Sequence, residues 1–266
     1  MTTSPIRIGA LISGTGTNLE AILRACETGY INGRVVFVGA DTPAAKGLLK
    51  AETRGIPTFV VDYSKIIREF KENPDPERLP EDYDGGDIIE RQFLFPKGSD
   101  PQKTATYFAT RALAESKLLS RMADHPFDLL ILAGFMRNLS PYFIDRLNTD
   151  PTRPKIMNIH PALLPAFPGT DGYGDTFRYG CKVGGCTVHF IDYGEDTGPI
   201  IGQRAFQITE TDTIESIKKK GLALEWELYP ECIALYAENR LTPVKMTYTL
   251  KNGDTRQRTV VKIAEN

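Results

Sequence analysis

The sequence predicts an α/β fold with a doubly wound, mostly parallel β-sheet and helices on both of its faces. Along most of the chain, short apolar runs alternate with stretches in which apolar residues recur at helical spacing. The apolar runs are nearly continuous, as expected for parallel strands that are buried on both sides. Successive parallel strands need a crossover, so this order predicts helices above and below a single sheet.

The first part of the chain keeps this rhythm as far as residue 62. An apolar run at 6–12 suits a buried strand, and the apolar residues that follow have helical spacing from Leu19 to Gly29. The remaining elements expected here are a strand at 35–39, a helix at 44–54 closed by Gly55, and a strand at 58–62.

Residues 63–103 interrupt that rhythm. The stretch 71–86 is rich in proline and acidic residues and has little to bury. We therefore expect a partly mobile surface insertion in a single domain that spans residues 1–266. The insertion could cover the site, support an interface, or have no catalytic role.

The alternation resumes after the insertion. A long helix is expected at 104–122, before an apolar central strand at 127–133. The tail at about 244–262 alternates around Asn252-Gly253, which is typical of a two-residue turn, so we expect a C-terminal β-hairpin. The other expected elements are helices at 141–147 and 213–238 and strands at 155–159, 185–191 and 199–207.

The composition argues against several classes of protein. A formal net charge of −2 gives no reason to expect a nucleic-acid or membrane-surface partner. No apolar run reaches the length of about 18 residues that a transmembrane helix needs, and the N-terminus shows no secretory signal. The spacing of the four cysteines favours reduced thiols over a zinc site or disulfides. We expect a cytoplasmic protein, a monomer or homodimer, with no metal.

A glycine-rich loop at 13–18 lies between the first strand and the first helix. Its glycines let an anion approach the backbone, and the helix N-terminus offers unpaired N–H groups. Thr17 and Asn18 can add side-chain donors, or one of them can cap the helix. The spacing matches neither the dinucleotide fingerprint nor the P-loop, so a phosphate site and a structural turn both stay open.

Asn158 and His160 end a predicted strand, and strand alternation places both side chains on the same side. The carboxyl edge of a parallel strand is where open α/β sheets build their sites. Asp196 follows in an acidic loop between two later strands. We expect Asp196 to accept a hydrogen bond from His160, orient the ring and raise its pKa. The structural alternatives are a core role for His160 and a turn role for Asp196.

Five ordered segments resemble the glycinamide ribonucleotide formyltransferases. They read IGALISGTGTNLEAI at 8–22, LAGFMRNLS at 132–140, NIHPALLP at 158–165, TVHF at 187–190 and DTGPII at 196–201. The resemblance covers about residues 6–62 and 105–242. It implies a Rossmann-like formyltransferase fold. It also implies transfer of a formyl group from 10-formyltetrahydrofolate to the amine of 5'-phosphoribosylglycinamide, a step of purine synthesis.

The resemblance also implies the site residues. Asn158 is expected to donate to the oxyanion of a tetrahedral intermediate, His160 to move the proton, and Asp196 to orient His160. A solvated position on a helix face is the alternative for Glu225 and Arg111. The implied ribonucleotide-binding residues are Gly16, Thr17, Asn18 and Glu225, and the implied folate-binding residues are Arg111, Met136, Arg137, Asn138, Leu139, Asp192, Tyr193, Gly194 and Glu195.

Two departures from the family pattern stand out. Tyr173 occupies a position at which members commonly have a histidine, and residues 63–103 have no counterpart in the short members. Three rival functions remain. They are a formyltetrahydrofolate hydrolase, which passes the formyl group to water, a sugar-nucleotide N-formyltransferase, and a non-catalytic folate- or nucleotide-binding relative.

Overall fold

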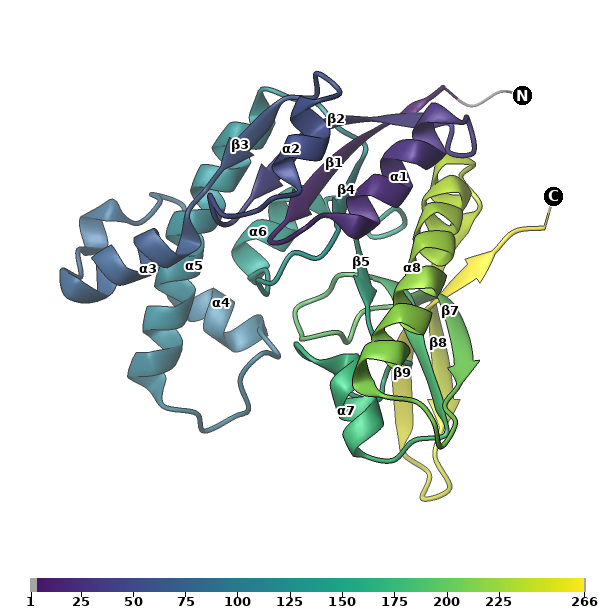
Figure 1. Cartoon of the computed structure of the whole chain (residues 1–266). Coiled ribbons are helices and arrows are strands. Elements are labelled where there is room, and N and C mark those ends of the chain that lie inside the picture. The colour runs from purple at the N-terminus through teal and green to yellow at the C-terminus, as the bar shows by residue number, and fades with distance from the viewer. Residues whose placement is uncertain (1–3, 266) are drawn as a thin grey trace.

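The computed structural model describes residues 4–265 and confirms the predicted α/β fold (Figure 1). One sheet crosses the molecule, and a separate two-stranded hairpin follows it near the C-terminus. The strands of the sheet are β1 (Ile6–Ile12), β2 (Gly33–Ala40), β3 (Thr58–Val60), β4 (Leu129–Leu132), β5 (Ile156–His160), β6 (Val183–Phe190) and β7 (Ile200–Gln207), and the hairpin strands are β8 (Leu241–Thr249) and β9 (Thr255–Ile263).

The sheet has the strand order β3-β2-β1-β4-β5-β6-β7. The first five strands in this order pair in parallel, and β6 and β7 extend one edge as antiparallel strands. The helices are α1 (Thr17–Glu27), α2 (Leu48–Glu52), α3 (Tyr63–Glu72), α4 (Gly85–Arg91), α5 (Pro101–Ala123), α6 (Pro141–Leu147), α7 (Gly172–Arg178) and α8 (Ile214–Ala237), with a short 3₁₀ turn, η1, at Pro76–Arg78.

Helices cover both faces of the parallel part, which explains its nearly continuous apolar runs. On β4, Ile131 belongs to the core shared with α1 and α8, whereas Leu130 and Leu132 belong to the core shared with α3, α5 and α6. All three side chains are buried. Successive residues of a strand point to opposite faces, so a strand that is covered on both sides needs apolar residues at every position.

Three local features differ from expectation. The helix expected at 44–54 shortens to α2, and α7 was not anticipated at all. The hairpin closes through three residues, 251–253, rather than two. The N–H of Leu250 donates to the carbonyl of Asp254, and Gly253 adopts a φ of 90° inside the turn.

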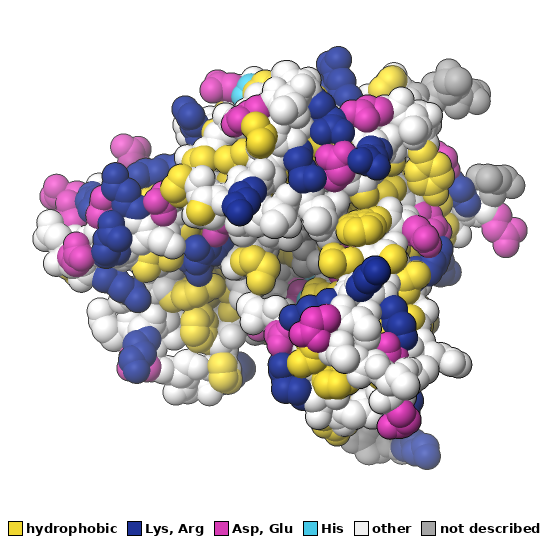
Figure 2. All heavy atoms as spheres, viewed as in Figure 1, with side chains coloured by type: hydrophobic (Ala, Val, Ile, Leu, Met, Phe, Trp, Pro, Cys, Tyr) yellow, Lys and Arg dark blue, Asp and Glu magenta, His cyan; other side chains and the backbone are white. Residues whose placement is uncertain are grey.

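The insertion at 63–103 folds into helices that pack on the domain. The stretch 71–86 contains no buried side chain, as expected. The residues just before it do pack on the domain, because Tyr63, Ile66 and Phe70 on one face of α3 are buried. Ile88 of α4 lies in a further apolar cluster with side chains of α5 and α6. Charged side chains of both signs are scattered over the face of the molecule in Figure 2, which is hollowed between α4 and α7.

The loops that follow β1 and β4 are tied together at the carboxyl edge of the sheet. The N–H of Ser13 donates to the carbonyl of Gly134 at 3.0 Å, and the Ser13 hydroxyl accepts from the N–H of Met136 at 2.8 Å. The glycine-rich loop and the segment after β4 are therefore joined directly to each other.

Candidate active site

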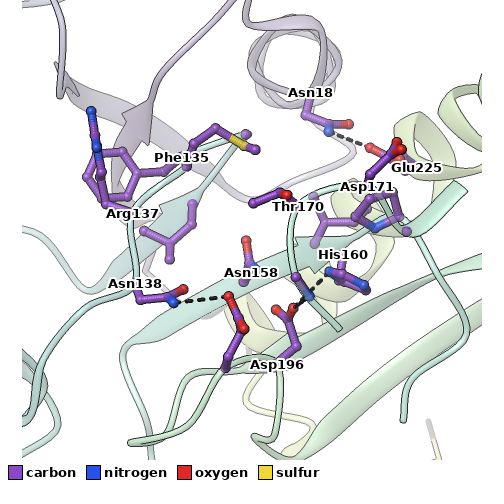
Figure 3. A pocket seen from close by; sticks show the side chains of 18 of the residues that line it. Asn18, Phe135, Arg137, Asn138, Asn158, His160, Thr170, Asp171, Asp196 and Glu225 are labelled. Atoms are coloured by element: carbon purple, nitrogen blue, oxygen red, sulfur yellow. Dashed lines mark hydrogen bonds and ion pairs between the residues drawn. The ribbon is translucent and has the colours of Figure 1, made fainter. Parts of the chain in front are cut away.

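A pocket of about 390 Å³ opens at the carboxyl ends of the central strands (Figure 3). The chain runs from β1 toward β2 and β3 on one side, and β4 and β5 lie on the other, so the strand order reverses at this point. Open α/β sheets usually bind ligands at such a switch point. The lining comes mainly from residues 17–18, 134–139, 158–161, 169–173, 191–192, 194–196, 218, 222 and 225.

His160 and Asp196 form a buried pair in this pocket. Nδ1 of His160 lies 3.1 Å from Oδ2 of Asp196, and only 3% of the histidine side chain is exposed. Nε2 of His160 donates to the carbonyl oxygen of Phe167 at 2.8 Å. The N–H of Gly169 donates to Oδ2 of Asp196 at 2.8 Å. Asp196 itself has a left-handed backbone, with a φ of 54°.

The pKa of His160 moves in the direction opposite to the one expected from the sequence. Burial lowers the pKa of His160, and the opposing effects of the Asp196 carboxylate and the Phe167 carbonyl do not fully offset it. Asp196 therefore acts on the ring as expected, but its effect is outweighed by the loss of hydration of the imidazolium. Burial raises the pKa of Asp196, but the nearby His189 ring, the charge of His160 and the N–H of Gly169 bring it below its ordinary value.

Asn158 lies beside this pair and is held by a second histidine that sequence reasoning did not assign. Asn158 and His189 face each other across β5 and β6, and Nδ2 of Asn158 lies 3.3 Å from Nε2 of His189. Nδ1 of His189 faces the carbonyl of Phe190 at 2.9 Å, so the proton belongs on Nδ1, and Nε2 accepts from Asn158. The amide is thus oriented by a fully buried ring.

Glu225, Asn18 and Tyr173 form a second buried group on the opposite wall. Nδ2 of Asn18 donates to one carboxylate oxygen of Glu225 at 2.7 Å, and the Tyr173 hydroxyl donates to the other at 2.6 Å. Burial raises the pKa of Glu225, and these two donors oppose the shift. Oδ1 of Asn18 is buried without a partner. The residue that departs from the family pattern is therefore bonded to a predicted ribonucleotide-binding residue.

The ring of Tyr173 fits against α8 because residue 221 has no side chain. A Cβ atom on Gly221 would lie 2.1 Å from Cζ of Tyr173 and 2.3 Å from its hydroxyl oxygen. A glycine in the interior of a helix is unfavourable by about 1 kcal/mol relative to alanine. Gly221 thus lowers the stability of α8 slightly, and its missing side chain leaves room for Tyr173 to reach Glu225.

The glycine-rich loop leads directly into α1. Gly16 adopts a φ of 68° as the N-cap residue, and no side chain caps the helix there. The alternative in which Thr17 or Asn18 caps the helix is therefore wrong. The first N–H groups of α1 therefore have no side-chain cap, and the helix dipole favours negative charge at this end of the helix.

The predicted folate segment forms another wall. Met136 is exposed and Leu139 is buried. Asn138 donates to Glu195 at 3.0 Å, which joins this segment to the loop that carries Asp196. Nε of Arg137 forms an ion pair with the buried carboxylate of Asp41.

Two predicted folate residues lie outside the pocket lining. Arg111 is buried in α5, where its guanidinium stacks 4.5 Å above the centre of the Tyr107 ring and leaves Nε and Nη1 without partners. The side chain of Tyr193 instead bonds to Asp145 of α6. Asp192, Gly194 and Glu195 on either side of Tyr193 do line the pocket.

Several further observations concern metals, cysteines and membranes. Within residues 4–265, no group of three or more His, Cys, Asp or Glu side chains is arranged to hold a metal ion. All four cysteines are free, and burial raises the pKa of the Cys186 thiol to about 12. Among the helices of the described chain, none is both long and apolar enough to cross a membrane.

The fold and the pocket place the chain in a known class of enzymes. Residues 6–233 match the model of the formyl transferase family, and the chain belongs to that family. It is a formyltransferase.

The relatives narrow the class further. The chain is 32% identical over 227 residues to phosphoribosylglycinamide formyltransferase of Bacillus subtilis, covering 85% of this chain and 92% of that one. It is 33% identical over 247 residues to the Mycobacterium tuberculosis enzyme of the same name, covering 93% and 92%. Glycinamide ribonucleotide transformylase 1 from Symbiobacterium toebii superposes with a TM-score of 0.68 at 34% identity, over 98% of this chain and 95% of that one.

Proposed function

We propose that the protein transfers a formyl group from 10-formyltetrahydrofolate to the amine of 5'-phosphoribosylglycinamide. The observation that carries this proposal is the division of one pocket into two sides. Asn138 and the loop that carries Asp196 lie on one side, Asn18 and Glu225 lie on the other, and Asn158 and His160 lie between them. The named relatives support the same reaction.

The side of the pocket proposed to bind the ribonucleotide combines an anion site with hydrogen-bond acceptors. Backbone N–H groups at the start of α1 face the phosphate. The free Oδ1 of Asn18 and the Glu225 carboxylate accept hydrogen bonds from hydroxyl or amine groups of the acceptor. A buried acceptor atom without a partner costs about 1–3 kcal/mol, which a bound donor would relieve.

The proposed chemistry needs one proton carrier and one oxyanion donor. The acceptor amine attacks the formyl carbon, a new C–N bond forms, and the amide of Asn158 donates to the resulting oxyanion. His160 takes the proton lost by the amine and returns it to N10 of the folate as the old C–N bond breaks. The lowered pKa of His160 favours a neutral ring near pH 7. With the single proton on Nδ1, toward Asp196, Nε2 can accept the amine proton once the Phe167 carbonyl is displaced. No cysteine lines the pocket, in keeping with direct transfer.

This mechanism requires a small rearrangement around His160. Both ring nitrogens contact protein groups, Asp196 on one side and the carbonyl of Phe167 on the other. Substrate has to displace the Phe167 carbonyl before Nε2 can reach the reacting amine. Phe167 and Gly169, with φ of 54° and 104°, lie in the loop that would have to move.

The test is a spectrophotometric assay with a 10-formylfolate analogue in the presence and absence of the ribonucleotide. Deformylation that depends on the ribonucleotide supports the proposal, and deformylation without it points to the hydrolase. Folate binding without turnover points to another amine acceptor or to a non-catalytic relative. His160→Ala should abolish the signal. His125→Ala should retain it, because His125 packs against Phe37 away from the pocket.

A further inference from the structure

The insertion contacts the back of the loop that carries Asp196. The N–H of Phe93, just after α4, donates to the carbonyl of Tyr193 at 3.0 Å. Nη1 of Arg91 lies 3.2 Å from the Tyr193 hydroxyl, and the guanidinium lies 5.4 Å from the centre of the Tyr193 ring. Residues about 100 positions apart in sequence are thus joined through both backbone and side chains.

Arg91 is itself fixed on two sides. Its Nε donates to Asp87 within α4 at 2.9 Å, and its Nη1 donates to Asp145 of α6 at 2.8 Å. The Tyr193 hydroxyl donates to the other oxygen of Asp145. Arg91, Tyr193 and Asp145 therefore form a closed set of contacts among α4, α6 and the loop. The apolar cluster around Ile88 anchors α4 beneath this set.

The loop has two sides with different partners. Asp192, Gly194, Glu195 and Asp196 line the pocket, whereas the Tyr193 side chain bonds to α4 and α6. Tyr193 is thus the only residue of 192–196 that is absent from the lining, and it provides the outer attachment. Without that attachment, the loop would have to lose backbone freedom when a ligand binds, which would weaken binding.

We propose that Arg91 is a positioning residue that holds this loop in its binding conformation, so that the insertion supports the donor side of the pocket. The inference rests on the proposed function, because it assigns the loop to the formylfolate. It predicts an effect on the folate and little effect on the ribonucleotide, whose predicted contacts lie on α1 and α8.

The experiment compares Arg91→Ala with Arg78→Ala. Arg78 lies in the same insertion, but its ion pair is with Glu69 at 3.8 Å and does not involve the loop. Arg91→Ala should raise the KM for the formylfolate about fivefold, as expected for loss of one or two net hydrogen bonds. The KM for the ribonucleotide should stay within about twofold. Arg78→Ala should change neither value. Arg91→Lys, which keeps the charge but not the planar fork, should restore only part of the loss.

Hydrogen exchange of the loop amides provides a readout that does not depend on turnover. Arg91→Ala should speed exchange at residues 192–196 and leave α1 unchanged. Tyr193→Phe, which removes the hydroxyl alone, should also speed exchange of the loop. It therefore provides the test if Arg91→Ala fails to fold. Combining the two changes should add little to either one, because both break the same set.

The outcomes separate this inference from the proposed function. A wild-type enzyme without ribonucleotide-dependent turnover would overturn the proposed function, and the exchange experiment would still decide whether Arg91 holds the loop. Unchanged loop exchange together with an unchanged folate KM would overturn the inference and leave the proposed function intact. Equal rises in both KM values would also overturn it, because they indicate a general structural role for Arg91.

Discussion

Replacing Gly221 by alanine tests how firmly the ring of Tyr173 is fixed against α8. In an open helix this change is stabilising, by about 1 kcal/mol. In this protein the new Cβ would lie 2.1 Å from Cζ of Tyr173, far inside van der Waals contact. The ring is buried, so it cannot turn into solvent and has to shift as a whole.

The expected loss follows from two contributions. Overpacking of a buried site costs about 1–3 kcal/mol, and a hydrogen bond to a charged group contributes about 1.5–3 kcal/mol. The second contribution is lost when the ring moves away from Glu225, to which its hydroxyl donates at 2.6 Å. After the gain in helix propensity, Gly221→Ala should destabilise the fold by about 2–4 kcal/mol.

Thermal and urea unfolding measure this change. The midpoint temperature should fall by about 5–15 °C for a chain of this size. In a Tyr173→Ala background the ring is gone, so the same change should stabilise the protein by about 1 kcal/mol. If Gly221→Ala stabilises the otherwise unchanged protein by that amount, the ring does not occupy the described position and the reasoning is wrong.

Further expectations concern the catalytic group and a buried carboxyl. His160→Ala should lower turnover at least about a hundredfold, and near-normal turnover would remove its assignment as proton carrier. Asn158→Ala should lower turnover comparably while calorimetry shows unchanged ribonucleotide binding. Asp196→Asn removes the carboxylate that raises the pKa of His160, so the acid limb of the kcat/KM profile should move to lower pH. A move to higher pH would contradict this. Burial raises the pKa of Glu115 from 4.5 to about 7. The unfolded chain therefore releases this proton first, and stability should fall as pH rises between about 4.5 and about 7. Glu115→Gln should flatten that slope in urea titrations.

The parallel part of the sheet was predictable because its central strands are buried on both faces and so consist of nearly continuous apolar runs. The apolar run at 127–133 identified β4 without any long-range information. Helix α3 was not predicted, although Tyr63, Ile66 and Phe70 recur at helical spacing, because the proline-rich and acidic residues that follow it dominate the composition of the insertion. No local signal marked α7, whose first turn contains Gly172 and Gly174 and which packs on α8.

The positions of site residues were predictable where they depend on the geometry of a single strand. Strand alternation placed Asn158 and His160 together, and both line the pocket. The direction of the His160 pKa could not be predicted, because it depends on how deeply the ring is buried. The role of His189 depends on the antiparallel register of β5 and β6, which a single sequence does not reveal.

The backbone at position 196 limits what the chain can carry there. Its φ of 54° is readily adopted by glycine, asparagine and aspartate, whereas most other side chains are strained in that region. Of these three residues, only aspartate is negatively charged and able to face His160 as an anion. Aspartate is therefore the one residue that both tolerates this φ and provides a negative charge. Random substitution at this codon should yield variants that either strain the loop or lose the charge, with no neutral replacement between them.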